Sequence, residues 1–107
     1  MVLLKQQNDN SIECLYDSTN ILGTKYNINE KRMAVIFSSG RQYVYEGVTF
    51  TDYSKFEGSE SQGKLLHTLI KKYPYSQSDK IVDVTPLKEQ IEEIKKTLWV
   101  KYTILIR

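Results

Sequence analysis

The clearest pattern of hydrophobic and polar positions lies in the first half of the chain and has the period of a β-sheet. Residues 24–26 lean toward β structure and precede a stretch of turn formers. Residues 32–37 are β-branched and apolar enough to form a strand, and strand character resumes over 41–48. The pattern therefore predicts a hairpin with a three-residue loop, in which Gly40 takes the left-handed conformation.

The register of this hairpin decides where Tyr43 and Tyr45 point, because alternate residues of a strand face opposite sides of a sheet. If Phe37 pairs with Arg41 across a three-residue loop, both tyrosines share the face of Phe37 and belong to the core or its rim. A two-residue loop would place them on the other, shallower face, which is better suited to stacking a ligand. The position of Gly40 favours the longer loop and the core.

Beyond the hairpin the period becomes helical. Thr49 or Thr51 can cap a short helix that stops near Gly58. Ser59 or Ser61 can cap a second helix, which ends before the next proline. The apolar positions of the second helix are Leu65, Leu66, Leu69, Ile70 and Tyr73. Its outer face carries Lys64, His67, Thr68, Lys71 and Lys72, with no acidic residue between.

The last third of the chain combines a short strand, a charged helix and an apolar tail. Residues 81–84 have strand character, and Thr85 with Pro86 suits the N-cap and first position of a helix. Residues 98–107 alternate like a strand, yet they could also extend this helix. Such a tail needs a partner, either the domain's own sheet or another chain. The residues expected in that contact are Leu87, Ile91, Ile94, Leu98, Trp99 and Tyr102.

Composition and charge add one feature to this picture. A chain of 107 residues with 40% hydrophobic positions forms one small domain with a modest core. Its net charge of +2 is too slight to imply nucleic acid. Residues 18–75, however, hold eight Lys or Arg against five acidic residues, whereas 1–17 are net −2 and 76–107 net +1. The positive charge is therefore concentrated in the middle of the chain.

Cysteine usage and the first residues indicate a cytoplasmic protein. Cys14 is the single cysteine, so it forms no internal disulfide, and we expect it to be a small buried hydrophobe. The apolar stretch at residues 1–5 is too short for a signal peptide, and no run is long enough to span a membrane.

Motifs of known catalytic and metal sites are missing from the sequence. There is no P-loop, G-x-G-x-x-G, C-x-x-C, H-E-x-x-H or G-x-S-x-G motif. A nucleophile pair of Cys14 and His67 is conceivable, but it rests only on the presence of the two residue types. We therefore expect a protein without catalytic residues, metal or cofactor.

Two features favour a binding function instead. The start of the second helix, Ser61-Gln-Gly63-Lys64, offers free backbone amides and a cation, which attract phosphate, although ordinary capping explains the same pattern. The acid-free helix face could meet a phosphate backbone while tyrosines stack on bases. The candidate ligand-binding residues are Arg41, Tyr43, Tyr45, Ser61, Gly63, Lys64, Lys71 and Lys72.

These residues also carry a resemblance to a known family. The motifs concerned are Ser18-Thr-Asn-Ile, Tyr26, Phe37, Gly40, Tyr43-Val-Tyr45, Val48, Tyr53, Ser61-Gln-Gly63 and Ile70-Lys-Lys-Tyr-Pro. Over residues 18–75 the chain resembles the KTSC domain, which is named for the C-terminus of some lysyl-tRNA synthetases and also occurs alone in small bacterial and phage proteins. The resemblance implies a compact unit of about three strands and two short helices. RNA binding is the function usually suggested for this family.

The chain departs from the family pattern at several positions. Thr49 stands where the family commonly has proline, and Leu69 stands where it has histidine. Leu65 and Leu66 replace aromatic residues. If those aromatics touch a ligand, this chain has lost the contact, whereas leucine is a tolerable replacement in a core.

We therefore predict an α+β domain with a small antiparallel sheet of about three strands, a pair of short helices packed on it, a C-terminal helix and an apolar tail. Residues 1–17 are an N-terminal extension, 18–75 the KTSC-like domain and 76–107 a C-terminal extension. The leading hypothesis is a non-enzymatic module that binds RNA or another phosphate-bearing ligand. The alternatives are docking on a host protein, self-association through residues 87–107, and sequestration of a small nucleotide.

Overall fold

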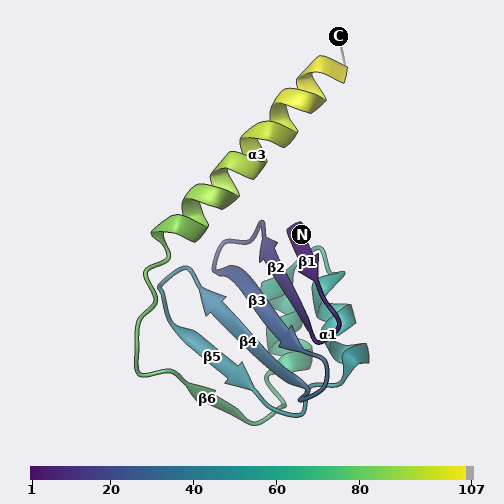
Figure 1. Cartoon of the computed structure of the whole chain (residues 1–107), viewed down its shortest axis with the longest axis vertical. Helices are drawn as coiled ribbons and strands as arrows, with labels where there is room; N and C mark the ends of the chain where they lie inside the picture. Colours follow the sequence, from purple (N-terminus) through teal and green to yellow (C-terminus); the bar gives the residue numbers. More distant parts are fainter. Residues whose placement is uncertain (106–107) are drawn as a thin grey trace.

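Six strands pair in chain order to form one antiparallel sheet (Figure 1). The structure is a computed structural model that describes the backbone of residues 1–105 and the side chains of residues 1–98. The strands are β1 (Val2–Gln7), β2 (Ser11–Tyr16), β3 (Ile21–Asn27), β4 (Arg32–Phe37), β5 (Gln42–Tyr45) and β6 (Tyr75–Gln77). The helices are α1 (Phe50–Glu57), α2 (Gln62–Leu65), which continues as the π-helical segment η1 (Leu66–Ile70), and α3 (Thr85–Leu105).

The α+β class is confirmed, but the prediction of about three strands is wrong. The N-terminal residues form β1 and β2, which pair with each other and with β3. β2 has the period-two burial of a strand, with Ile12, Cys14 and Tyr16 buried, although the short apolar stretches did not stand out in the sequence. β6 is exposed along its length and is held by backbone pairing with β5. Pairing with a distant strand, rather than local hydrophobicity, creates this last strand.

α1, α2 and η1 cover one face of the sheet, and the core lies between them (Figure 1). Tyr26 stacks on Tyr53 with ring centroids 4.3 Å apart, and Tyr16 meets Phe56 edge to face at 5.7 Å. Aromatic rings dominate this small core because each buries a large apolar area. The other fully buried side chains include Ile12, Ile21, Met33, Val35, Tyr45, Val48, Gln62 and Ile70.

The hydroxyls of Tyr16, Tyr26 and Tyr53 have hydrogen-bond partners inside this core. Tyr16 Oη lies 2.7 Å from Thr24 Oγ1, and Tyr26 Oη donates to the Val48 carbonyl at 2.6 Å. Within residues 1–98 no buried side-chain nitrogen or oxygen lacks a partner. The core is therefore aromatic and hydrogen-bonded at the same time, which avoids the cost of unpaired buried polar groups.

The predicted hairpin is confirmed, including its register. Phe37 N donates to the Arg41 carbonyl at 2.9 Å across a three-residue loop, and Gly40 has a φ of 88°. Val35 pairs with Tyr43, and Met33 with Tyr45. Both tyrosines therefore lie on the helix-covered face of the sheet.

The two short helices begin where the sequence predicts. Thr49 accepts a hydrogen bond from Asp52 N and caps α1, and Ser61 accepts one from Lys64 N and caps α2. The second helix then widens into η1, where Lys71 N donates to the carbonyl of Leu66, five residues earlier, at 2.9 Å. Segments of π-helix occur frequently at functional sites.

Residues 81–84 do not form the predicted strand. β6 already occupies the edge of β5, so this β-branched segment runs past the hairpin, to which Val82 N donates one backbone hydrogen bond, at the Gly40 carbonyl and 2.8 Å long. Ile81 is 72% exposed. Strand propensity without a free edge to pair with does not produce a strand.

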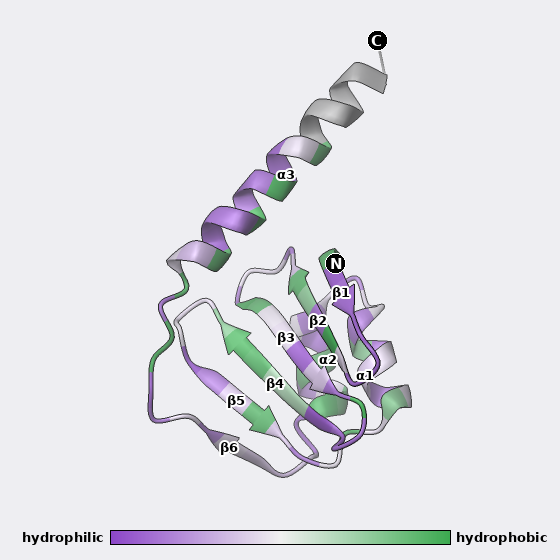
Figure 2. Ribbon diagram, in the orientation of Figure 1, coloured by the Kyte–Doolittle hydropathy of each residue, from purple (hydrophilic) through white to green (hydrophobic). Residues whose placement is uncertain are grey.

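α3 begins at Thr85, so that Thr85 is its first residue and not its N-cap. The backbone is helical as far as Leu105, and the described part of the tail is therefore helix. α3 contacts β1 and β2 near its start and then extends away from the sheet (Figure 1). Its described side chains are mostly hydrophilic with isolated hydrophobic positions (Figure 2). None of the described helices is long and apolar enough to cross a membrane.

Candidate functional site

A hollow of 340 Å³ lies between η1 and the β4–β5 hairpin. Aromatic, basic, neutral polar and aliphatic side chains line it, and none of them is acidic. They are the aromatic residues Phe37, Tyr43 and Tyr45, the basic residues Arg41, His67 and Lys71, and Asn20, Ser38, Ser39 and Leu66. We call this site the basic hollow.

Hydrogen bonds and register hold the walls of the basic hollow. Ser38 N donates to the Asn20 carbonyl at 2.9 Å, which joins the loop before β3 to the hairpin loop. The hairpin register sets Arg41 and Tyr43 on one wall. On the opposite wall, the wide turn of η1 presents His67 and its C-cap Lys71. Segments far apart in the sequence thus bring the basic groups together.

The basic groups of this hollow are exposed and lack acidic partners. Arg41, His67 and Lys71 are all exposed. Among the described side chains, neither Arg41 nor Lys71 forms a salt bridge. A concave wall with unneutralised positive charge concentrates anions near it.

The two tyrosines of β5 have different environments. Tyr45 is 1% exposed, lies at the base of the hollow, and has a hydroxyl pKa that burial raises. Tyr43 is half-buried and meets Phe37 edge to face at 5.3 Å. Tyr45 is therefore architectural, and Tyr43 is the tyrosine of this pair that a ligand in the hollow can reach.

The remaining predicted binding residues lie outside the basic hollow. Ser61 Oγ accepts from Lys64 N at 3.4 Å, which is ordinary helix capping. Gly63 faces Asn20, and a Cβ built there would lie 3.5 Å from Asn20 Oδ1, an ordinary contact distance. Lys64 is exposed beside this cap. The structure thus brings together Arg41, Tyr43, Tyr45 and Lys71, but not Ser61, Gly63 or Lys64.

Lys72 also lies outside the hollow, although it follows Lys71 directly. Its Nζ is 3.1 Å from Asp52 Oδ2 and 5.3 Å from the ring centroid of Tyr73. The Tyr73 hydroxyl donates to the same carboxylate, and this hydrogen bond together with Lys72 lowers the pKa of Asp52. Lys72 therefore ties the second helix to α1, whereas Lys71 has no acidic partner among the side chains of residues 1–98.

Sequence reasoning did not identify Asn20, Phe37, Ser38 and Ser39 as residues of a site. What these four residues share is their place in the fold, because all of them lie in or beside the two loops, 17–20 and 38–41, that border the hollow. The sequence indicates His67 as part of a helix face and as a conceivable partner of Cys14, but not as a residue of this hollow. The sequence contains no local signal that these loops and η1 meet.

Cys14 and His67 do not form the conceivable nucleophile pair. The Cys14 side chain is 3% exposed, and its sulfur lies 3.6 Å from the Tyr53 hydroxyl and 3.4 Å from Glu57 Oε1. Burial raises the pKa of this thiol. Cys14 therefore matches the prediction of a small buried hydrophobe. Within the described part of the chain, no group of three or more His, Cys, Asp or Glu residues could hold a metal ion.

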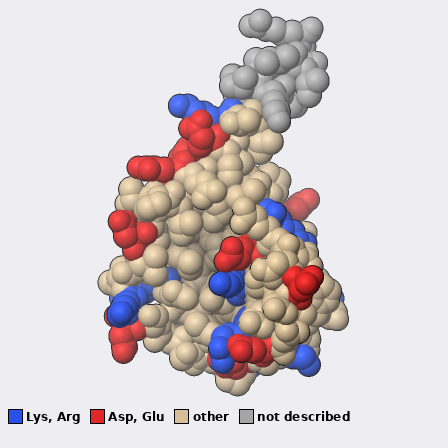
Figure 3. All heavy atoms as spheres, in the orientation of Figure 1, with Lys and Arg blue, Asp and Glu red and all other residues tan. Residues whose placement is uncertain are grey.

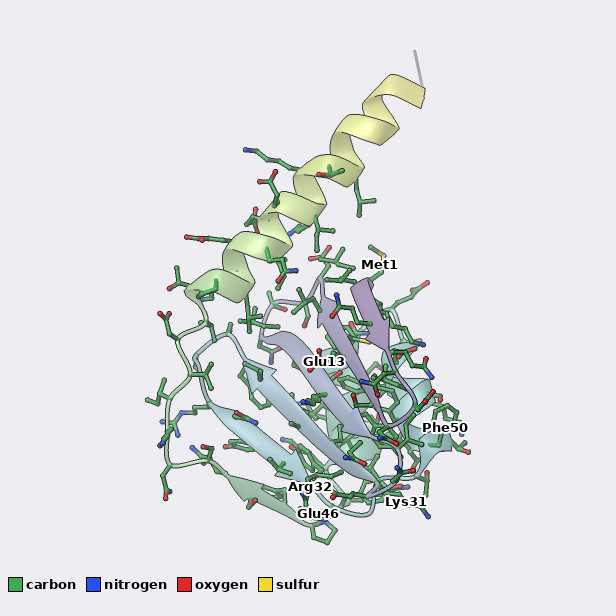
Figure 4. The ribbon with its side chains drawn as sticks, viewed as in Figure 1. Met1, Glu13, Lys31, Arg32, Glu46 and Phe50 are labelled. Carbon is green, nitrogen blue, oxygen red and sulfur yellow. The ribbon has the colours of Figure 1, made fainter. Side chains whose placement is uncertain are left out.

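The opposite face of the sheet carries a second, more apolar hollow of 290 Å³ beneath α3. Its aliphatic lining consists of Leu4, Leu15, Ala34, Ile36 and Leu87. Charged residues of both signs are spread over this face without a patch of one sign (Figure 3). Glu13 pairs with Lys25 at 3.5 Å, and Arg32 pairs with Glu46 at 3.0 Å at the end of the sheet far from α3 (Figure 4).

The fold and the basic hollow define a small α+β domain with a positively charged, partly aromatic site. The family model of the KTSC domain matches residues 17–75, more than half of the chain, and the protein therefore belongs to the KTSC domain family. This finding confirms the resemblance inferred from the sequence. All the residues that line the basic hollow lie within the matched segment.

A solved structure of a KTSC domain protein from Yersinia pestis has the same fold. It is 21% identical in sequence, with a TM-score of 0.58 over 70% of this chain and 96% of that one. No curated protein matches the chain.

Proposed function

We propose that this protein is a non-enzymatic binding module that takes a phosphate-bearing ligand, foremost RNA, in the basic hollow. The observation that carries the proposal is the convergence of Arg41, His67 and Lys71 on one hollow without a lining acid, beside the half-buried Tyr43. A guanidinium binds phosphate oxygens in pairs, and an ammonium adds a mobile donor.

The rest of the lining suits the same ligand. Asn20, Ser38 and Ser39 add neutral polar groups that can contact sugar or base edges. The exposed part of Tyr43 offers a surface for stacking. A lone buried thiol that forms no disulfide suits the cytoplasm, where RNA is found.

Few phosphates can be neutralised in a site of this size. With two permanently charged groups, Arg41 and Lys71, the logarithm of the affinity for a single strand should fall with the logarithm of salt concentration with a slope of about −1.4. Binding is therefore expected to be weak and to be detectable only at low salt.

The direct test is a filter-binding titration at low salt with single-stranded and duplex RNA. We expect Lys71→Ala to weaken binding about threefold to tenfold and to reduce the salt slope by about 0.7. Lys72→Ala is the matched control, because Lys72 pairs with Asp52 outside the hollow, and it should leave affinity unchanged. Absence of RNA retention at micromolar protein would contradict the proposal.

The same titration distinguishes a nucleotide-sequestering protein from an RNA-binding one. A mononucleotide occupies the hollow with one phosphate group, so its affinity should change little with salt. If a mononucleotide binds as tightly as RNA and with little salt dependence, the ligand is a small nucleotide.

Self-association through α3 is a second candidate function, favoured by the apolar seam of this helix. Leu87 and Ile91 face the sheet, and Ile91 is 6% exposed. Farther along, Ile94 is half-buried and Leu98 is 48% exposed, so the seam continues beyond the sheet that covers its start. The predicted contact residues Trp99 and Tyr102 lie outside the residues whose side chains are described.

Sedimentation velocity of the full chain tests this second candidate. A dimer that Leu98→Glu converts to a monomer is the expected result, because the carboxylate would have to be buried in the contact. A monomer at all concentrations in both proteins would remove self-association and leave docking on a host protein as the remaining role for the seam.

A further inference from the structure

An aromatic row crosses three neighbouring strands beside the basic hollow. Phe37 on β4 meets Tyr43 on β5 at 5.3 Å, and Tyr43 stacks on Tyr75 of β6 at 5.4 Å with the rings only 5° from parallel. Two inter-strand spacings separate the ends of the row, which makes it roughly 10 Å long. The hollow lies at the Phe37 end, and Tyr75 lies at the edge of the sheet.

Tyr75 is the exposed end of this row. It is 59% exposed, although its ring also lies 5.6 Å from that of Tyr45. β6 is the last strand of the sheet, so the stack stops at Tyr75 within the described residues. A planar group arriving from solvent can extend a parallel stack with the same geometry.

We propose that Tyr75 is a base-stacking position and that the ligand of the basic hollow is single-stranded nucleic acid of at least two nucleotides. This inference rests on the proposed function and specifies its ligand. One nucleotide places its phosphate at Arg41 and Lys71, and a neighbouring nucleotide stacks its base on Tyr75. A duplex keeps its bases stacked on one another, and it therefore cannot use this position without unpairing.

The position of the basic groups supports this arrangement. Arg41 comes two residues before Tyr43 on the strand that holds the middle of the row, and Lys71 comes four residues before Tyr75. Arg41 and Lys71 line the same hollow as Phe37 and Tyr43, so a phosphate held there lies beside the row, and Tyr75 stacks on Tyr43 outside the hollow. A mononucleotide bound near Phe37 occupies only one end of the row.

The decisive experiment measures binding of the full chain by calorimetry at low salt. The ligands are 5′-phosphorylated uridylates of one, two and four nucleotides, and a longer RNA as single strand and as duplex. The variants are Tyr75→Leu, which keeps an apolar side chain but removes the ring, and Tyr75→Phe, which keeps the ring. Phe50→Leu is the matched control, because Phe50 is 53% exposed on α1 and lines no part of the hollow (Figure 4).

We expect the two- and four-nucleotide ligands to bind more tightly than the mononucleotide, by about fivefold or more, and the single strand more tightly than the duplex. Tyr75→Leu should remove this gain and leave mononucleotide affinity unchanged, which also shows that the hollow remains intact. Tyr75→Phe and Phe50→Leu should behave like the parent protein.

Two other outcomes would overturn the inference in distinguishable ways. If the mononucleotide binds but longer strands bind no better, or Tyr75→Leu binds them as tightly as the parent, the basic hollow is a site and Tyr75 is only structural. If neither mononucleotide nor longer RNA binds, the proposed function fails together with the inference.

Discussion

At the scale of single residues, two positions along β5 distinguish a tyrosine of the core from a tyrosine that a ligand can reach. Tyr43 and Tyr45 have the same chemistry and point to the same face of β5. Tyr45 is completely covered, whereas Tyr43 lies at the margin of the helix layer and beside the hollow. We therefore expect Tyr45 to contribute mainly to stability and Tyr43 mainly to ligand binding.

Truncation of the two tyrosines tests this separation. Tyr45→Ala should lower the free energy of unfolding by about 3–5 kcal/mol, because it removes a fully buried ring from the core at the base of the hollow. Tyr43→Ala should cost about 1–2 kcal/mol and weaken RNA binding instead. Urea unfolding and filter binding of both variants measure the two effects. Equal losses of stability would contradict the distinction.

The buried tyrosines also predict how stability depends on pH. Burial raises the pKa of the Tyr16 and Tyr53 hydroxyls far above that of an exposed tyrosine. In the unfolded chain these groups ionise near pH 10. Their contribution to stability is therefore fully present below about pH 10 and is lost as the pH rises above it.

Urea unfolding from neutral to alkaline pH measures this loss. The free energy of unfolding should decline above about pH 10, and tyrosinate absorbance should develop in two stages, with the buried class ionising only on unfolding. If all eight tyrosines titrated together while the protein remained folded, the burial argument would be wrong.

Among the elements, β6, the 78–84 segment and η1 depend on their neighbours. Segment 78–84 attaches to the hairpin through Gly40, whose carbonyl accepts from Val82 N. A Cβ on Gly40 would lie 2.5 Å from the Val82 carbonyl oxygen and 2.7 Å from Ile81 Cγ2. The glycine therefore serves both the hairpin turn and the docking of the following segment.

Substitution of two glycines can separate these roles. Gly40→Ala should cost about 2–4 kcal/mol through strain and collision. Gly47→Ala should cost about 1 kcal/mol, because its φ of 75° is strained but nothing lies within 4 Å of the added Cβ. Urea unfolding measures both costs, and faster hydrogen exchange at Val82 in Gly40→Ala alone would report undocking. Similar losses in the free energy of unfolding for the two variants would show that the contact with segment 78–84 does not stabilise the fold.

At the scale of the whole molecule, α3 is attached to the domain by few contacts. It touches β1 and β2, chiefly through apolar residues of its first turns, and Lys95 forms a 3.4 Å ion pair with Asp17. The family model ends ten residues before α3 begins. Segments with few buried contacts open locally at lower free energy than the core.

Ile91→Asp should therefore release α3 without unfolding the sheet. We expect amide exchange in residues 85–98 to accelerate strongly, while the amides of β3 and β4 keep their protection. Glu92→Gln, at a largely exposed position on the same helix, is the control and should change neither. Equal acceleration in α3 and the sheet would show that the helix is an integral part of the folding unit.

Local physical chemistry made several features predictable from the sequence. The glycine position of the 32–48 hairpin fixed its loop and hence its register. Thr49 and Ser61 marked helix starts, because a side-chain oxygen there satisfies a free backbone amide. The motifs of residues 18–75 also indicated the family.

Only the tertiary structure decided the features that depend on segments far apart in the chain. β1, β2 and β6 exist through pairing, which β6 achieves without a hydrophobic pattern of its own. Lys71 and Lys72 are adjacent in sequence, yet one lines the basic hollow and the other pairs with α1. The sequence by itself determined the local turns, caps and charge of this protein, because they depend on neighbouring residues. The folded chain decided which of those charges and aromatic rings meet, because backbone pairing and burial act between residues that the sequence separates.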